Sequence, residues 1–132
     1  MKRVALLCLL LAGCGGAPPP DLFEVKRSGD DRNANLTLLV SDGGSVTCNG
    51  REHQITGEQL LAAREIEREL SPQAELNLAL PPGPNSVLSY RVRLEAGEVS
   101  FADTSRPLPP SFSKLTVFTA DVSENVCGLE RR

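Results

Sequence analysis

The N-terminal segment decides where this chain folds, and therefore which covalent links it can form. Two basic residues follow Met1, an apolar stretch covers residues 4–11, and the small residues Ala12 and Gly13 come directly before Cys14. A basic start, a short apolar run and small residues are typical of a secretory signal that is removed from the mature protein. The apolar run is far shorter than the ~20 residues that a membrane-spanning helix needs. We therefore expect a protein that folds outside the cytoplasm.

The four residues Leu11-Ala12-Gly13-Cys14 resemble the lipobox of bacterial lipoproteins. The resemblance implies that Cys14 receives a diacylglyceryl group and becomes the new N-terminus when residues 1–13 are cleaved off as a signal peptide. Two acyl chains anchor a protein stably, because each buried methylene contributes only ~0.8 kcal/mol and one chain alone is marginal. We expect a lipid-anchored protein on the extracytoplasmic face of the cell membrane, or on the outer membrane of a host with two membranes. The alternative is an ordinary signal peptide in which Cys14 stands by chance.

Residues 14–21 predict a tether between the lipidated cysteine and the folded part. Gly15 and Gly16 keep the chain flexible, and the prolines at 18–20 favour an extended form that advances ~3.1 Å per residue. Residues 22–132 follow, and a stretch of this length is typical of a single domain.

The charge and the residue types of the chain argue against several classes of function. The formal net charge is −3, and it becomes more negative when Lys2 and Arg3 are cleaved off, whereas nucleic-acid binding needs clustered basic residues. The only histidine is His53, and no set of residues has the spacing of a metal site, a serine triad or a phosphate-binding glycine loop. We therefore expect no enzyme, no cofactor and no metal, and a partner that is an unidentified envelope protein.

Alternation of apolar and polar residues predicts a small antiparallel sheet of about five strands. Glycines in Asp42-Gly43-Gly44 supply the backbone conformations of a tight hairpin turn, and Asn49-Gly50 is another turn pair. Leu76, Leu78 and Leu80 also alternate and could add one short strand. The strands are expected at residues 22–27, 35–40, 45–48, 88–94 and 99–101.

A first helix is expected to begin at Thr56, because Thr56 and Gln59 have the spacing of a capping box. Ile55 before the cap and Leu60 after it are placed for a hydrophobic staple. Leu60, Ala63, Ile66 and Leu70 lie along one helical face, the charged residues form a solvated face, and Pro72 is expected to end the helix.

The last segment is compatible with two structures. Pro109-Pro110 can open a helix, Gly128 can cap it, and apolar residues recur between them at helical spacing. Residues 115–119 are instead rich in strand-forming types. We predict a helix, which gives an α+β domain with two helices packed on one face of the sheet.

Two cysteines, Cys48 and Cys127, remain after the loss of Cys8 and the lipidation of Cys14. Outside the cytoplasm such a pair is expected to form a disulfide. A bond that closes a loop of about 80 residues contributes ~4.5 kcal/mol by chain-entropy reasoning. A redox-active pair is the alternative, but such pairs usually have the C-x-x-C spacing that this chain lacks.

Three short stretches, residues 23–29, residues 36–44 and the Leu60-Leu61 helix, carry a resemblance to a known family. Together with the later hairpin and final helix they resemble emfourin-type inhibitors of thermolysin-like metallopeptidases, and small actinobacterial lipoproteins of related pattern. The resemblance implies an exposed, ordered loop that enters an enzyme cleft, for which Pro81–Asn85 is the candidate. We expect a small non-catalytic binding or structural module, with metallopeptidase inhibition as the alternative.

Overall fold

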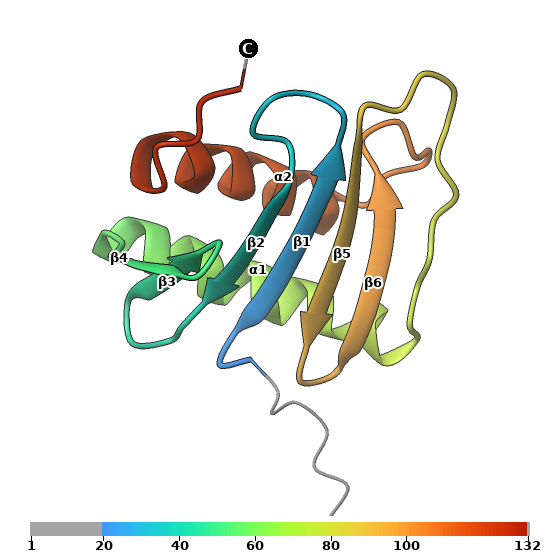
Figure 1. Cartoon of the computed structure of the whole chain (residues 1–132). Helices are drawn as coiled ribbons and strands as arrows, with labels where there is room; N and C mark the ends of the chain where they lie inside the picture. The colour runs from blue at the N-terminus through green and yellow to red at the C-terminus, as the bar shows by residue number, and fades with distance from the viewer. Residues whose placement is uncertain (1–19, 132) are drawn as a thin grey trace, which may run out of the picture.

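The computed structural model describes residues 20–131, which form one antiparallel sheet with helices on one side (Figure 1). Cys14, the predicted signal peptide and most of the predicted tether lie outside the described residues. The sheet has six strands in the order β4-β3-β2-β1-β5-β6, one more than expected. The strands are β1 (Phe23–Gly29), β2 (Leu36–Val40), β3 (Ser45–Cys48), β4 (Arg51–Gln54), β5 (Leu88–Leu94) and β6 (Gly97–Ala102).

Helices α1 (Gly57–Glu75) and α2 (Pro110–Asp121) cover the same face of the sheet, which confirms the predicted α+β architecture. A five-residue π-helical segment, η1 (Val122–Val126), continues α2 toward the C-terminus. The helix predicted for the last segment is therefore confirmed. The apolar residues at helical spacing decide against a strand, because they all face the sheet in a helix, and Phe112, Leu115, Phe118 and Val122 are buried.

The core lies between the helices and the inner face of the sheet, and the strand alternation fills it as expected. In β1 the buried residues are Phe23, Val25 and Arg27, whereas the residues between them reach the open face. Aromatic rings join the layers, since Phe112 of α2 stacks on Phe101 of β6 with ring centroids 4.8 Å apart. The fully buried side chains thus come from both helices and from the central strands.

Strand β4 (Arg51–Gln54) was not predicted, because its four residues are polar and show no apolar alternation. It pairs with β3 through the Asn49-Gly50 turn, in which both residues have positive φ angles of 48° and 88°. Such a two-residue turn directs the chain back along the preceding strand whatever residues follow. An edge strand with mostly exposed side chains needs no apolar residue, and the charges on it oppose pairing with another chain.

The capping box of α1 is confirmed, but the prediction that Pro72 ends the helix is wrong. The Thr56 hydroxyl accepts from the Gln59 amide at 3.1 Å, and the Gln59 side chain accepts from the Thr56 amide at 2.9 Å. The helix runs three residues past Pro72 because tertiary packing holds its last turn. Ala74 is fully buried there, and its carbonyl oxygen lies so close to Gly97 that a side chain at Gly97 would overlap it.

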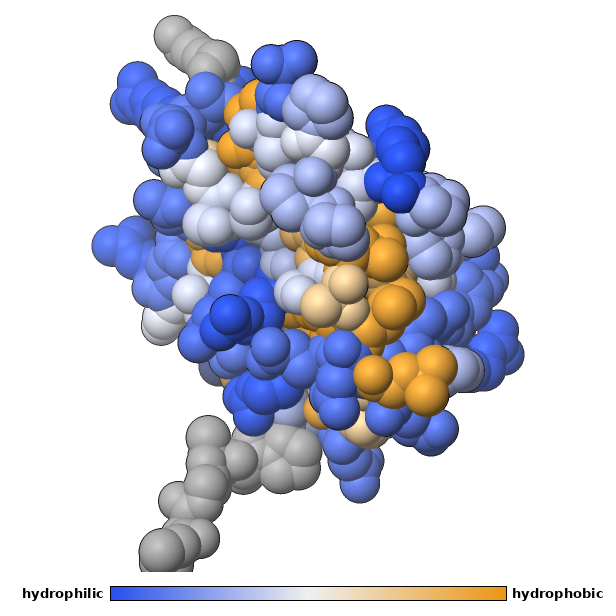
Figure 2. All heavy atoms as spheres, turned by 90° about the vertical axis from the view of Figure 1, so that its right-hand side faces the viewer, coloured by the Kyte–Doolittle hydropathy of each residue, from blue (hydrophilic) through white to orange (hydrophobic). Residues whose placement is uncertain are grey.

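The segment after α1 does not form the strand that alternating leucines suggested. Only Ala79 makes an isolated parallel bridge, to Ser100 of β6. The Ser100 amide donates to the Leu78 carbonyl at 3.0 Å, and the Leu80 amide donates to the Ser100 carbonyl at 2.8 Å. Leu76 is exposed instead. The segment covers the outer edge of β6, and Figure 2 shows that apolar residues gather on this side of the molecule within a hydrophilic border.

The predicted disulfide is present and links Cys48, at the end of β3, to Cys127, directly after η1. The two Cα atoms are 5.9 Å apart, and the residues are 79 positions apart in the sequence. The bond therefore fixes the last helical segment to the side of the sheet that carries β3 and β4.

Arg27 is a buried cation at the end of β1, with a side chain of which only 3% is exposed. Its guanidinium donates to the carbonyl oxygens of Ala34 and Asn33 at 2.9 Å and 3.0 Å, and to the Ser123 hydroxyl at 3.1 Å. Burial lowers the pKa of Arg27. One side chain thus joins β1, the β1–β2 turn and η1.

Tyr90 gives a direct optical test of this packing, because it is the only tyrosine and the chain has no tryptophan. Burial raises the pKa of Tyr90 above its usual value of 10.0, and the charge of Arg27 lowers this pKa by a smaller amount. A group with a raised folded pKa stabilises the fold below its unfolded pKa, so this stabilisation is lost as the pH rises past about 10. We expect the tyrosinate absorbance near 295 nm to titrate above pH 10 in the folded protein and near 10 in guanidinium. Equal midpoints in both states would contradict the buried position.

Candidate functional site

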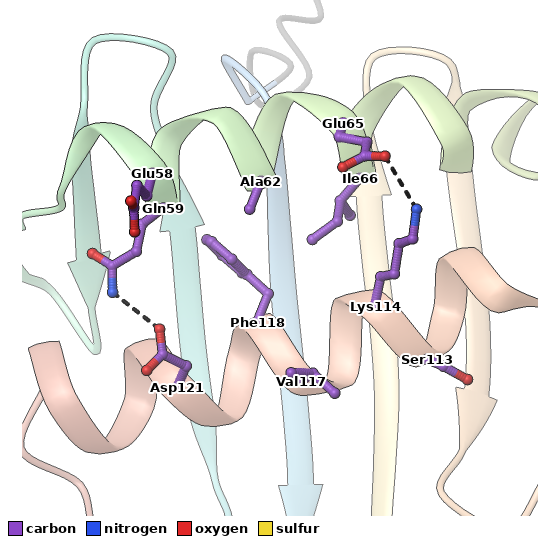
Figure 3. A pocket seen from close by; sticks show the side chains of 10 residues that line it. All are labelled: Glu58, Gln59, Ala62, Glu65, Ile66, Ser113, Lys114, Val117, Phe118 and Asp121. Atoms are coloured by element: carbon purple, nitrogen blue, oxygen red, sulfur yellow. Dashed lines mark hydrogen bonds and ion pairs between the residues drawn. The ribbon is translucent and has the colours of Figure 1, made fainter.

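A groove of about 640 Å³ runs between α1 and α2 on the side of the helices away from the sheet. The helices are antiparallel, since Gln59 in the first turn of α1 meets Asp121 at the end of α2. Figure 3 shows the two helices and the side chains between them. The lining residues are Glu58, Gln59, Ala62, Glu65, Ile66, Ser113, Lys114, Val117, Phe118 and Asp121.

Apolar side chains form the centre of the groove. Ala62 and Ile66 of α1 and Phe118 of α2 point toward one another across it (Figure 3). Ala62 is the smallest of these side chains, and a methyl group at this position leaves room between the helices. Val117 on the wall is 70% exposed, although a β-branched apolar residue is usually buried. The exposed apolar surface of the groove therefore comes mainly from Val117, whereas Ile66 and Phe118, which are 2% and 6% exposed, form its buried floor.

Polar bridges between the helices close the groove at both ends. The Gln59 amide nitrogen donates to an Asp121 carboxylate oxygen at 3.0 Å. At the other end the Lys114 ammonium lies 3.2 Å from a Glu65 oxygen and 2.8 Å from a Glu69 oxygen. These exposed contacts connect α1 and α2 at the two ends of the groove.

The rim of the groove is acidic. Glu58, Glu65 and Asp121 line it, and the one lining cation, Lys114, is already bound by Glu65 and Glu69. The hydrogen bond from Lys114 lowers the pKa of Glu69, and the same contact raises the pKa of Lys114. Both groups are therefore charged at neutral pH, and the bridge persists until the pH falls below the lowered pKa of Glu69.

The groove is a site that sequence reasoning missed, because the acidic residues of α1 were interpreted as a solvated face. The available signal was an apolar residue on the outer face of α2. Val117 is 70% exposed and does not fit the helical stripe that packs on the sheet.

The residues singled out from the sequence lie elsewhere. His53 is on the edge strand β4, and no group of three or more metal-ligating side chains occurs within residues 20–131. The loop Pro81–Asn85 is mainly exposed, and it is fastened to the turn after β6. The Thr104 hydroxyl donates to the Gly83 carbonyl at 3.0 Å, and the Ser105 hydroxyl donates to the Pro81 carbonyl at 2.9 Å.

In the part of the chain that the structure describes, neither α1 nor α2 has the length and apolar character required to cross a bilayer. Comparison with protein-family models, with curated proteins and with solved structures finds no match to this chain.

Proposed function

We propose that this protein is a lipid-anchored, non-catalytic binding module of the bacterial cell envelope. In this proposal the groove between α1 and α2 receives a basic amphipathic helix of an envelope protein. The observation that carries the proposal is the combination of an apolar centre with an acidic rim. Ala62, Ile66 and Phe118 form the centre, and Glu58, Glu65 and Asp121 form the rim. Helices bind in grooves of this kind through apolar anchors spaced three and four residues apart.

The charge of the rim selects among possible occupants. A second copy of this chain placed groove to groove would bring Glu58, Glu65 and Asp121 against the same carboxylates, which disfavours that pairing. Anionic lipid headgroups are disfavoured for the same reason. Lysine and arginine side chains that flank an apolar helix face would instead complement the rim and speed association.

The position of the chain ends supports an anchored arrangement. The described chain enters the sheet at β1, where the Leu22 amide donates to the Val40 carbonyl at 3.2 Å. The C-terminal residues lie at the opposite end of the molecule (Figure 1). A lipid on Cys14 would therefore hold one end of the sheet toward the membrane and leave the groove accessible along its side.

Replacing Cys14 by alanine tests the anchor. We expect the wild-type protein to fractionate with membranes and to carry a diacylglyceryl mass on Cys14. The Cys14→Ala variant should lack that mass and retain residues 1–13, because the expected cleavage depends on the lipidated cysteine. Mass spectrometry of the N-terminal peptide and fractionation of cells measure the two effects. Cys8→Ala is the matched control, because Cys8 lies inside the predicted signal peptide. A wild-type protein without lipid on Cys14 would overturn the anchor.

Replacing Ala62 by tryptophan tests the groove. The larger side chain fills the space between the helices, so we expect it to weaken binding of a synthetic leucine–lysine amphipathic helix about tenfold or more, since about 1.4 kcal/mol corresponds to a tenfold change. Leu61→Trp is the matched control, because Leu61 is exposed on the same helix but does not line the groove. Fluorescence anisotropy with a labelled peptide measures the affinity, and circular dichroism checks the fold. Equal affinity of both variants, or equal binding of a leucine–glutamate helix, would contradict the proposal.

Inhibition of a thermolysin-type metallopeptidase is the second candidate function. The observation in its favour is that the exposed loop Pro81–Asn85 is held by hydrogen bonds from Thr104 and Ser105. A preorganised loop binds an enzyme cleft without a large ordering cost. A peptidase assay with the folded protein tests this function, and Thr104→Val should weaken inhibition by releasing the loop. Full peptidase activity at a large excess of the protein would exclude it.

A further inference from the structure

Another hollow, of about 400 Å³, lies on the face of the sheet away from the helices. Strands β1, β5 and β6 form its floor, and Leu80 and Pro82 of the segment beside β6 form one wall. Tyr90 and Phe101 contribute main-chain atoms, because successive side chains alternate and theirs belong to the core. Its volume is within the range of about 300–1,000 Å³ that small-molecule sites occupy.

The strand register places hydrogen-bond donors together on this floor. In one row Lys26 of β1 stands opposite Arg91 of β5, which stands opposite Ser100 of β6. In the next row Ser28 stands opposite Ser89. Lysine and arginine side chains only donate, and hydroxyl groups can donate as well. The surface therefore matches a ligand that presents anionic or other acceptor oxygens.

The two cations stand directly opposite each other, and each has a carboxylate partner outside the hollow. Like charges directly opposite each other on antiparallel strands destabilise the pair. Glu24 lies 4.0 Å from Lys26 and Glu98 lies 3.5 Å from Arg91, but neither carboxylate lines the hollow. An anion bound in the hollow would lie between the two cations, on the side that these carboxylates do not occupy.

The serine hydroxyls of the hollow are available to a ligand. Within residues 20–131, the hydroxyls of Ser28, Ser89 and Ser100 form no hydrogen bond with another protein group. The carboxylate of Asp103, directly after β6, accepts from the Ser86 hydroxyl at 2.9 Å and from the Val87 amide at 3.2 Å. It is therefore engaged by the loop before β5.

We propose that this hollow binds a small ligand that carries a carboxylate or phosphate group. Lys26 and Arg91 bind the anionic oxygens, the serine row binds further oxygens of the ligand, and Leu80 and Pro82 contact its apolar part. Ser28 lies near the end of β1, and Ser89 stands opposite it in β5. The site is therefore near the end of the sheet that lies away from the start of β1 and from the predicted anchor. The site is independent of the groove between α1 and α2.

Titration of the isotope-labelled full chain in detergent micelles tests this site by nuclear magnetic resonance. The probes are glucuronate and inorganic phosphate, with glucose as the neutral control. We expect saturable amide shifts in β1, β5 and β6 with at least one anion, and none with glucose. The double variant Lys26→Gln, Arg91→Gln should bind the anion at least about tenfold more weakly than the wild type, because hydrogen bonds to charged groups are the strong ones.

Arg51→Gln is the matched control, since Arg51 is an exposed cation on the opposite edge of the same sheet. Its affinity for the anions should equal that of the wild type. Saturation by glucuronate alone would assign an organic acid as the ligand, and saturation by phosphate alone would assign a phosphate group. The proposal is overturned when neither anion gives saturable shifts, or when the double variant and Arg51→Gln bind as tightly as the wild type.

Discussion

Loss of the disulfide is expected to lower the free energy of unfolding by about 4.5 kcal/mol, the largest effect of any change considered for the described residues. The bond joins positions 79 residues apart, so its removal frees a long loop in the unfolded chain. The suitable variant is Cys48→Ala, Cys127→Ser, because Cys48 is buried and alanine leaves no unpaired hydroxyl there. Guanidinium unfolding, followed by circular dichroism, measures the difference.

The same variant should also loosen the end of the chain more than the centre of the sheet. Cys127 follows η1 directly, and its amide donates to the Val122 carbonyl at 2.8 Å. We expect faster amide exchange in residues 122–127 than in β1 and β5. The wild-type protein under reducing conditions is the control and should behave like the variant. A loss of less than about 1 kcal/mol would show that the link contributes little to the fold.

Replacing Arg27 by methionine is expected to cost about 3 kcal/mol, although methionine retains the length of the side chain. The change removes three hydrogen bonds from a charged donor, and it leaves the buried Ala34 carbonyl and the half-buried Asn33 carbonyl without that donor. Unpaired buried acceptors carry the full cost of their lost hydration. Thermal and guanidinium unfolding measure the effect.

Two further variants separate charge from geometry at this position. Arg27→Lys keeps the charge, but one ammonium group lacks the planar fork that reaches Ala34, Asn33 and Ser123 together, so an intermediate loss is expected. Ser123→Ala removes a single acceptor and should cost about 1 kcal/mol. Equal stability of Arg27→Met and the wild type would show that the network contributes nothing.

Local patterns predicted the elements that bury one face. Phe23 and Val25 alternate in β1, and the apolar residues of α1 and α2 recur at helical spacing, so the sheet, the helices and the disulfide followed from the sequence. Strand β4 and the last turn of α1 did not follow, for opposite reasons. In β4 a turn imposes pairing on polar residues, and around Pro72 tertiary packing outweighs local helix preference.

The candidate sites were harder to predict than the fold, because they depend on residues that meet only after folding. Gln59 and Asp121 are 62 positions apart, and no local pattern indicates that they close one end of a groove. Arg27 lies within residues 23–29, one of the stretches that carry the family resemblance, but its hydrogen bond to Ser123 joins positions 96 residues apart. The opposition of Lys26 and Arg91 likewise requires the register of β1 and β5.

The two edges of the sheet have a consequence for crowding. If the proposed lipid anchor is present, it confines copies to a plane, where their local concentration rises and an unprotected strand edge can extend from one molecule to the next. Here β4 presents polar and charged side chains at one edge, and the segment around Ala79 occupies hydrogen-bonding positions beside β6 at the other. Neighbouring copies would therefore meet a polar, charged strand at one edge and a partly covered strand at the other, and anchored copies at high density should remain separate molecules and not polymerise.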